Sequence, residues 1–478
     1  MNIVMSCSEA TPLAKTGGLA DVVHALSAEL VKLNHKVYII MPYYQSIRNK
    51  SEANIRPIAK YKVDLAWRKQ ECEVYETIIN GITYILIGNV QYFNRQNLYG
   101  YDDDNERFAF LSLATRKVIE ELDLKPDIIH CHDWHVGMLP VLIKEQNAND
   151  IRFKNVRFVL TIHNPAFKGM FDPYFLGDYY GLSDELYSTG KVRYNGAVSS
   201  LKAAIMYCDK ITTVSPTHAE ELLSPDSGHD LNTVLELRRL DFCGILNGID
   251  YSEFDPEKDD KIYRNFKERT LTIGKRFNKS KLLEEMHLDQ NSKPLYGMVS
   301  RLTWQKGSEL VVAAAEKILQ SGCSLIILGS GEYNFEQELE RLRAKYPNQM
   351  GIYIGYNDVL AHKIYAACDI FLMPSLFEPC GISQMIALRY GAIPLVRMTG
   401  GLNDTVIPYV QDNRNIATGF GFYAYEKEAI CNTVSWANYC FENEALFKKL
   451  RKNAIQCNND WSKSANEYLN IYKEAMNK

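Results

Sequence analysis

The sequence predicts an α/β protein built from two doubly wound parallel sheets, and three observations support this fold class. The chain has 478 residues, and at roughly 150 residues per domain this length corresponds to two or three domains. Short, almost continuously apolar segments alternate with stretches of helical periodicity, a pattern typical of parallel strands that are covered by helices on both faces. A charge-rich segment, residues 255–276, interrupts this alternation, which then begins again.

The first series of apolar segments predicts one sheet within residues 1–247. A helix is expected after the first strand, over residues 19–33, because apolar residues there recur on one face. Polar residues gather at the C-terminal ends of the strands, where ligands bind in open α/β sheets. The expected strands are residues 3–5, 37–41, 84–87, 127–130, 158–162 and 211–214.

The second series predicts another sheet within residues 248–460. A helix is expected over residues 308–319, where Leu310, Val311, Ala314 and Ile318 share one face. The expected strands of this domain are residues 295–299, 324–328, 352–354, 370–373 and 393–396.

Composition and charge exclude several classes of protein. Hydrophobic residues make up 46% and charged residues 23% of the chain, which are ordinary values for a globular domain. The 54 basic and 58 acidic residues leave no basic excess of the kind that nucleic-acid binders show. The sequence has no leader-like N-terminus and no apolar run near the roughly 18 residues of a membrane helix. We therefore expect a cytoplasmic protein without a nucleic-acid or membrane partner.

The cysteines and tyrosines each carry an expectation. The 11 cysteines are odd in number and dispersed, which favours buried, reduced thiols over a disulfide framework. The 30 tyrosines suit either packing or stacking on sugars, because each ring combines an apolar face with a polar tip. A cluster that could stack on a sugar comprises Tyr92, Phe93, Tyr99 and Tyr101.

Two glycine pairs open expected helices. Lys15 precedes Gly17 and Gly18, so a phosphate could approach the backbone closely and meet a cation. A tight turn with a solvated lysine is the alternative. Residues 399–404 resemble residues 16–21, and both gene duplication and independent use of the same loop remain open as explanations.

Histidines follow two neighbouring expected strands. His130, His132 and His135 surround Asp133 and Trp134, and His163 ends the next strand. A zinc hydrolase is one alternative, although the aspartate comes one position too early for its H-x-H-x-D-H motif. We favour an Asp133 that faces substrate, with packing or capping as the alternative, and an active-site role for His163.

Two cations and a glutamate follow strands of the second series. Arg301 and Lys306 lie between a strand and a helix, where they could bind a diphosphate. Glu378 lies in a proline-bounded loop after the strand at 370–373, and a glutamate can accept hydrogen bonds from sugar hydroxyls.

Taken together and in order, these motifs resemble glycosyltransferase family 5, the bacterial glycogen synthases and plant starch synthases. The resemblance implies a GT-B fold, with two Rossmann-like domains facing across a cleft and a C-terminal helix, within residues 461–478, that crosses back to the first domain. It also implies retaining transfer of glucose from ADP-glucose to the non-reducing end of an α-1,4-glucan, without a metal. The matching segments include Glu9 and residues 15–21, 130–135, 161–164, 247–250, 300–307, 377–381 and 399–402.

The resemblance assigns roles by position. Residues 1–247 become the glucan domain and residues 248–460 the nucleotide-sugar domain. Expected catalytic residues are Asp133, His163, Arg301, Lys306 and Glu378. Expected donor-binding residues are Lys15, Gly17, Gly18, Asn247, Tyr356, Cys380, Gly381, Ile382, Thr399 and Gly400. Expected acceptor-binding residues are Glu9, Tyr92 and Trp134. A GT-B enzyme with another donor, a phosphorylase and an inactive glucan-binding protein remain alternatives.

Overall fold

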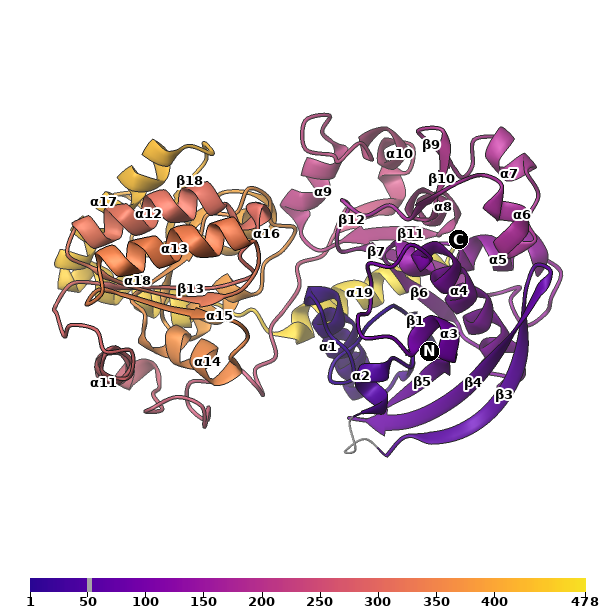
Figure 1. Cartoon of the computed structure of the whole chain (residues 1–478), viewed down its shortest axis with the longest axis horizontal. Helices are drawn as coiled ribbons and strands as arrows, with labels where there is room; N and C mark the ends of the chain where they lie inside the picture. The colour runs from indigo at the N-terminus through magenta and orange to yellow at the C-terminus, as the bar shows by residue number, and fades with distance from the viewer. Residues whose placement is uncertain (50–53) are drawn as a thin grey trace. The chain divides into compact units, whose positions relative to one another are not determined.

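The chain folds into two compact units. The computed structural model describes residues 1–49 and 54–478. Unit 1 comprises Met1–Asn247 together with Trp461–Lys478, and unit 2 comprises Gly248–Asp460 (Figure 1). These limits coincide with the domain limits expected from the sequence.

Unit 1 is built on a nine-stranded sheet in the order β12-β11-β7-β6-β1-β2-β5-β4-β3. Seven strands are parallel, and β3 and β4 form an antiparallel hairpin that extends the sheet beyond β5. The parallel strands are β1 (Asn2–Ser6), β2 (Lys36–Pro42), β5 (Ile82–Gly88), β6 (Ile128–His132), β7 (Arg157–Ile162), β11 (Lys210–Thr213) and β12 (Phe242–Gly244). The hairpin strands are β3 (Arg56–Leu65) and β4 (Arg68–Ile79).

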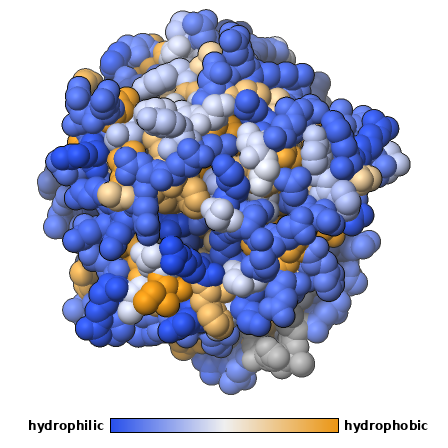
Figure 2. All heavy atoms as spheres, turned by 90° about the vertical axis from the view of Figure 1, so that its left-hand side faces the viewer, coloured by the Kyte–Doolittle hydropathy of each residue, from blue (hydrophilic) through white to orange (hydrophobic). Residues whose placement is uncertain are grey.

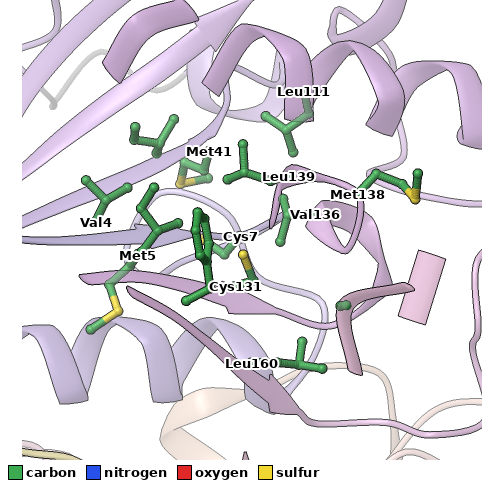
Figure 3. Packing of buried hydrophobic residues seen from close by; sticks show 14 of the residues in the cluster. Val4, Met5, Cys7, Met41, Leu111, Cys131, Val136, Met138, Leu139 and Leu160 are labelled. Carbon is green, nitrogen blue, oxygen red and sulfur yellow. The ribbon is translucent and has the colours of Figure 1, made fainter. Parts of the chain in front are cut away.

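Helices cover both faces of this sheet and enclose its core. The strands β1, β6 and β7 are buried almost throughout, and Val4, Met5, Cys131 and Leu160 pack in that core with Leu139 (Figure 3). The longer helices are α1 (Gly18–Lys32), α4 (Asp104–Glu121), α5 (Leu139–Gln146), α8 (Ser200–Tyr207) and α9 (Pro216–Leu223). The shorter ones are α2 (Gln45–Arg48), α3 (Val90–Phe93), α6 (Phe175–Tyr180), α7 (Glu185–Ser188) and α10 (Asn232–Glu236). A small sheet combines β8 (Met170–Phe171), β9 (Arg193–Tyr194) and β10 (Ala197–Ser199).

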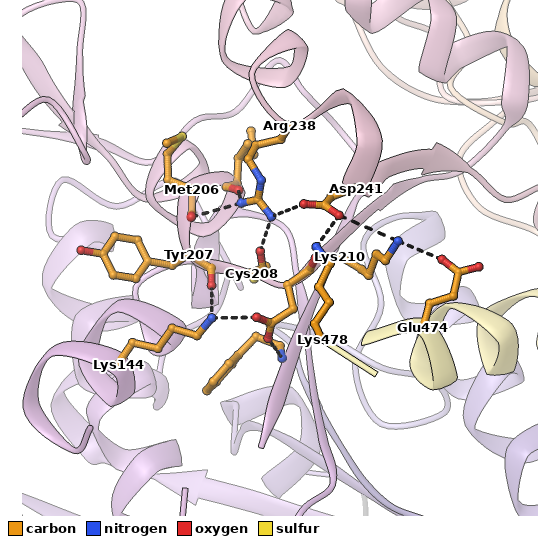
Figure 4. Close-up of polar contacts among 12 residues, drawn as sticks. Lys144, Met206, Tyr207, Cys208, Lys210, Arg238, Asp241, Glu474 and Lys478 are labelled. Atoms are coloured by element: carbon orange, nitrogen blue, oxygen red, sulfur yellow. Dashed lines mark hydrogen bonds and ion pairs between the residues drawn. The ribbon is translucent and has the colours of Figure 1, made fainter. Parts of the chain in front are cut away.

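The C-terminal helix α19 (Trp461–Met476) belongs to unit 1, where it packs on α1 and β7. Ion pairs fasten its end: Glu474 lies 2.8 Å from Lys210, and Lys478 pairs with Asp241 (Figure 4). The helix also buries Tyr472 against the sheet.

Unit 2 has a six-stranded, fully parallel sheet in the order β15-β14-β13-β16-β17-β18. Its strands are β13 (Leu295–Val299), β14 (Ser324–Gly329), β15 (Met350–Ile354), β16 (Ile370–Met373), β17 (Ile393–Arg397) and β18 (Phe420–Phe422). Its helices are α11 (Leu271–Glu285), α12 (Ser308–Gln320), α13 (Tyr333–Lys345), α14 (Asp358–Ala367), α15 (Ser383–Arg389), α16 (Gly400–Thr405), α17 (Lys427–Glu442) and α18 (Glu444–Ile455).

Both sheets reverse their strand order at one point. When the parallel strands of each unit are counted along the chain, each sheet reads 3-2-1-4-5-6, and unit 1 adds a seventh strand. The order reverses between β1 and β6 in unit 1 and between β13 and β16 in unit 2. Loops at the C-terminal ends of these strands form the usual ligand site of such folds.

Two further expectations concern the thiols and the membrane. All 11 cysteines are free and none is exposed, which confirms the expectation of unpaired thiols. In the described part of the chain, no helix is both long and apolar enough to cross a membrane.

Candidate active site

The loop after β1 is folded around Glu9. The Oε2 atom of this buried glutamate accepts the backbone N–H of Thr16 at 2.6 Å and the Thr16 hydroxyl at 2.8 Å. Burial raises the pKa of Glu9, and the bonds from Thr16 oppose that rise. These bonds place the glycine pair at the start of α1. A Cβ atom on Gly17 would lie 3.8 Å from Glu9 Oε1, so the backbone there is open to a ligand.

Lys15 is held in position by the first turn of α1. Its Nζ lies 2.7 Å from Asp21 Oδ2, and half of its side chain is exposed. Burial raises the pKa of Asp21, and the lysine opposes the rise. The expected cation is therefore present at the helix start, paired with a carboxylate.

Asp133 joins the loops after β6 and β7. Its backbone has φ 59°, a left-handed conformation, and its side chain is buried. Oδ1 accepts the backbone N–H of His163 at 2.7 Å and that of Asn164 at 3.3 Å. Burial raises the Asp133 pKa to about 7, although these two bonds lower it. The geometry thus gives Asp133 a capping contact that positions His163.

A second bond holds the His163 ring. His132 Nδ1 lies 2.9 Å from His163 Nε2, so one ring donates and the other accepts. Burial lowers the pKa of both, that of His163 to about 3. The pair is therefore neutral at neutral pH, and His163 can present a hydrogen bond to a substrate without carrying a charge.

The three clustered histidines do not converge as metal ligands. His130 uses both ring nitrogens, with Tyr472 OH at 2.8 Å and Thr161 Oγ1 at 2.7 Å. His135 is stacked on Trp134 at 4.3 Å. Among the residues that the structure describes, the metal-ligand side chains that meet are instead Glu253, Asp358 and His362 of unit 2. Lys261 lies 2.6 Å from that aspartate. The geometry of the described residues thus gives no support to the zinc alternative built on residues 130–135.

The expected acceptor residues differ in their exposure. Trp134 is half-buried and packs edge-on against Phe108 at 5.2 Å. Tyr92 is completely buried, and its hydroxyl donates to Glu106. Its ring has no face for a glucan, so the expectation of acceptor stacking on Tyr92 is corrected: the ring is core packing. Phe93 is equally buried. The sequence left both packing and stacking open, because a tyrosine in a polar segment gives no sign of its burial.

Asn247 ends unit 1 just beyond β12, the edge strand. It is buried, and its side-chain Oδ1 has no hydrogen-bond partner within the described residues. A buried acceptor without a partner usually has a ligand or water to meet. This is consistent with the expected place of Asn247 at a substrate.

In unit 2 the loops after β13 and β16 meet at an ion pair. Lys306 Nζ contacts Glu378 Oε2, and both side chains are largely buried, with 15% and 7% exposed. The Ser375 hydroxyl donates to the same oxygen at 3.1 Å. These contacts bring together two of the expected catalytic residues.

Glycines let a third loop approach the same place. The Gly401 N–H donates to Glu378 O at 3.1 Å. Gly400 has φ 44°, and a Cβ atom there would lie 2.0 Å from Glu378 O. Thr399 precedes this close approach and is buried. Only glycine allows the loop after β17 to lie so near the glutamate.

Gln384 fixes the loop that follows Glu378. Its Nε2 donates to Cys380 O and Gly381 O, both at 3.1 Å. Gly381 adopts φ 75°, and Ile382 lies half-buried immediately before α15. This role of Gln384 was not predicted, because a single glutamine belongs to no motif that would indicate it.

Arg301 and Tyr356 are the exposed members of this edge. The Arg301 side chain makes no hydrogen bond or ion pair to any residue that the structure describes. Tyr356 is 85% exposed and follows β15, the outermost strand. Gly307, directly after Lys306, has φ 77°, and a Cβ there would lie 2.2 Å from Pro374 O. An exposed arginine thus lies in the loop that also carries Lys306 of the buried Lys306–Glu378 pair.

Comparisons with known proteins decide the family. A model of the starch synthase catalytic domain matches residues 2–237, and a model of glycosyl transferases group 1 matches residues 281–456. The chain is 42% identical to a glycogen synthase of Clostridium kluyveri, with all of both chains covered. It is 40% identical to one of Geobacillus thermodenitrificans, covering 100% of this chain and 98% of the other. The chain belongs to the glycogen and starch synthase family.

A solved structure of this family agrees over the whole chain. The catalytic domain of starch synthase IV from Arabidopsis thaliana, bound to ADP and acarbose, superposes with a TM-score of 0.93 at 30% identity, covering 100% of this chain and 99% of the other. A sucrose-phosphate synthase from Thermosynechococcus elongatus shares the fold alone, with a TM-score of 0.62 at 17% identity, 99% of this chain and 98% of the other being covered. The chain is therefore a GT-B glycosyltransferase with two Rossmann-like units.

Proposed function

We propose that this enzyme transfers glucose from ADP-glucose to the non-reducing end of an α-1,4-glucan, with retention of configuration and release of ADP. The observation that carries the proposal is the C-terminal edge of unit 2. There the exposed Arg301, which has no side-chain partner among the described residues, lies in the same loop as Lys306 of the buried Lys306–Glu378 pair. The starch synthase relative that superposes on the whole chain was solved with ADP and acarbose.

Arg301 and Lys306 are assigned to the diphosphate. Negative charge grows on the leaving diphosphate as the bond to glucose stretches, so fixed cations stabilise the transition state more than the ground state. Lys306 is already fixed by Glu378, and Arg301 is accessible. Lys15 and the open backbone at Gly17 and Gly18 suit the same anionic donor.

The remaining donor contacts are assigned to loops of unit 2. Glu378 and the loop of Cys380, Gly381 and Ile382 are assigned to the glucose hydroxyls, together with Thr399 and with Gly400, whose backbone lies against that glutamate. Exposed Tyr356 is assigned to the nucleotide, and Asn247, through its unpartnered oxygen, to the substrate.

His163 is assigned to the reacting sugar as a neutral hydrogen-bonding group, and Asp133 positions it. Glu9 and Trp134 are assigned to the acceptor side.

The anomeric configuration is retained because the leaving group departs from, and the acceptor attacks, the same face of the sugar through an oxocarbenium-like state. The leaving phosphate takes the proton of the acceptor hydroxyl. We propose no covalent glucosyl–Glu378 intermediate, because Glu378 is assigned to the glucose hydroxyls and the position eight residues later, where a second carboxylate would stand, is Ile386. Cationic side chains take the role that a metal would otherwise have, so we propose a metal-independent reaction.

The test is transfer from ADP-, UDP- and GDP-glucose to maltooligosaccharides, with product length and anomeric configuration read out before and after chelator treatment. We expect lengthened α-1,4 chains, a preference for ADP-glucose and no loss of activity with chelator. A preference for another donor, or for glucose 1-phosphate, would assign the chain to another transferase or to a phosphorylase. Absence of transfer from every donor would leave a glucan-binding protein.

A further inference from the structure

Three aromatic side chains form a row on the surface of unit 2, which we call the aromatic ladder: Tyr409, Trp436 and Tyr439. The ring centroids of Tyr409 and Trp436 are 5.8 Å apart with planes 5° from parallel, and those of Trp436 and Tyr439 are 5.6 Å apart and 16° from parallel. Trp436 is 39% and Tyr439 66% exposed. An exposed row of near-parallel rings forms apolar surface of the kind that marks a candidate ligand site.

Two rings of the ladder, Trp436 and Tyr439, lie on the outer face of α17, and Tyr409 comes from the segment between α16 and β18. The opposite face of α17 packs into the core of unit 2 through Ile430, Val434, Ala437 and Cys440. Because that face anchors the helix, the exposed rings are not needed to fix it. Figure 2 views the end of unit 2 at which α17 and α18 lie in Figure 1, and hydrophobic colour there is confined to separate patches on a mostly hydrophilic surface. A broad apolar protein interface is not visible on that face.

Open grooves adjoin both ends of the ladder. Tyr439 lines one of about 630 Å³, and Tyr409 lines another of about 500 Å³, which are volumes in the range of small-molecule sites. Their other walls are mainly hydroxyl, amide and charged side chains. These include Ser292, Ser321, Ser435 and Asn438 in the first, and Gln411, Arg414, Asn415 and Asn443 in the second.

Asn438 supplies an oriented donor in the first groove. Its Oδ1 accepts the hydroxyl of buried Tyr296 at 2.7 Å and the thiol of Cys323 at 3.6 Å. The amide oxygen is thereby committed to the protein. The Nδ2 group makes no hydrogen bond to a described residue, and it remains available to a ligand in the groove that Asn438 lines. Lys293 and Glu442, which also line this groove, form an ion pair with each other, so their opposite charges cancel.

The ladder lies at the edge of the sheet opposite to the candidate active site. Its first groove includes Pro294 and Cys323, which immediately precede β13 and β14, whereas Arg301 follows β13. The five residues of β13 separate these edges by roughly 16 Å at about 3.3 Å per residue. A ligand at the ladder is therefore not in the donor site.

We propose that the aromatic ladder and its two grooves are a second binding site for α-1,4-glucan, which retains the polymer while the catalytic site extends another of its chains. The inference rests on the proposed function, since that function makes a glucan the acceptor. Flat rings flanked by hydroxyl and amide groups suit a sugar, which has apolar ring faces and hydroxyls at its edges. A branched polymer that engages two sites on one protein gains affinity through effective concentration.

The test compares Trp436→Ala with wild type in native gel electrophoresis through immobilised glycogen and in transfer to glycogen and to maltotriose. We expect at least about fivefold weaker retention by glycogen and a matching rise in KM for glycogen. The kcat and the KM for maltotriose stay unchanged, because a trisaccharide cannot span both sites. Tyr439→Ala behaves similarly, and Trp436→Phe recovers most of the retention.

The matched control is Phe277→Ala, which removes another 39% exposed ring of unit 2, on α11, and leaves retention unchanged. Unchanged retention of Trp436→Ala, or an equal effect on maltotriose, overturns the proposal. A wild-type dimer that becomes monomeric in Trp436→Ala without loss of glycogen binding assigns the ladder to an interface between copies, which also overturns it. Retention of the protein by glycogen in the gel requires no catalysis. If this retention depends on the ladder but no glucosyl transfer is detected, the proposed function is refuted and the ladder proposal is not.

Discussion

The two units share a strand order, but they fasten their functional loops differently. In unit 1, side chains hold the loops: Glu9 binds Thr16, Asp133 binds the backbone of His163, and His132 binds its ring. In unit 2, the Lys306–Glu378 ion pair also joins two loops, but there a third loop lies with its backbone directly against the pair at a glycine, where Gly400 adjoins Glu378 O. The buried titratable groups of the first edge therefore make it sensitive to pH, whereas the second edge tolerates little added volume.

This comparison also resolves the repeated Thr-Gly-Gly sequence. Gly17 and Gly18 follow β1, the first parallel strand of unit 1, whereas Gly400 and Gly401 follow β17, the fifth strand of unit 2. A Cβ atom would have 3.8 Å of space at Gly17 but only 2.0 Å at Gly400. Because the segments occupy different topological positions and meet different neighbours, the structure favours independent use of a glycine loop over duplication.

The largest expected effect on stability lies at the buried ion pair of unit 2. Lys306→Met leaves the Glu378 carboxylate without its counter-ion and lowers the free energy of unfolding by about 3–5 kcal/mol. The double variant with Glu378→Gln recovers most of that loss, because no charge is left unpaired, while glucosyl transfer remains lost. Urea titration of the four proteins measures this, and additive losses in the double variant would show that the two side chains do not act as a pair.

Alanine substitutions at one glycine of each unit test whether the loops of the two units are packed with different amounts of space. Gly400→Ala places a methyl group on Glu378 O and costs about 2–3 kcal/mol through strain and overlap. Gly17→Ala meets no atom within 3.4 Å and leaves the unfolding free energy within about 0.5 kcal/mol. Thermal unfolding of both variants measures the contrast. Equal losses would mean that the loops are fastened alike.

Asp133 gives unit 1 a defined dependence on pH. Its pKa rises from 3.8 to about 7 on folding, so the folded protein holds a proton that the unfolded chain has lost. This contribution to stability is complete below pH 3.8 and is lost as pH rises to about 7, at about 1 kcal/mol per pH unit. Asp133→Asn keeps the acceptor oxygen but does not titrate. Its stability relative to wild type should therefore increase from pH 5 to 7 and then level off, and a difference that is constant with pH contradicts the assignment.

The smallest effect is expected at Tyr92. Tyr92→Phe keeps the buried ring and removes the hydroxyl that donates to Glu106, which costs about 1 kcal/mol of stability. Glycogen retention stays at the wild-type level, because the ring packs in the core. Weaker retention with unchanged stability would restore the expectation that Tyr92 contacts the acceptor.

The elements that the sequence predicted well are those with uniform burial. The expected segment 295–299 is β13 and 370–373 is β16, without a shift at either end. The β3–β4 hairpin was not predicted, because its strands alternate exposed and half-buried residues, many of them charged. Such strands lack both the continuous apolar run and a clean alternation.

The site residues were predictable where their types form distinctive motifs. Their pairing was not predictable, because it depends on contacts between loops that are distant in the sequence. The motifs located Lys306 and Glu378, but their pairing joins residues 72 positions apart. The capping contact of Asp133 and the neutral state of the His132–His163 pair depend on burial that no local pattern reveals. Local sequence thus indicated which residues gather at each edge, whereas folding determined which of them touch.

The most direct test of the account is the turnover of Arg301→Ala with ADP-glucose and maltooligosaccharide. The guanidinium is exposed and unpaired within the described structure, so its removal leaves the melting temperature unchanged. The account predicts a kcat about 100- to 1,000-fold lower, while Arg276→Ala, which removes another exposed arginine of unit 2, turns over like wild type. Comparable turnover of Arg301→Ala and wild type would contradict the assignment of this edge to the nucleotide diphosphate.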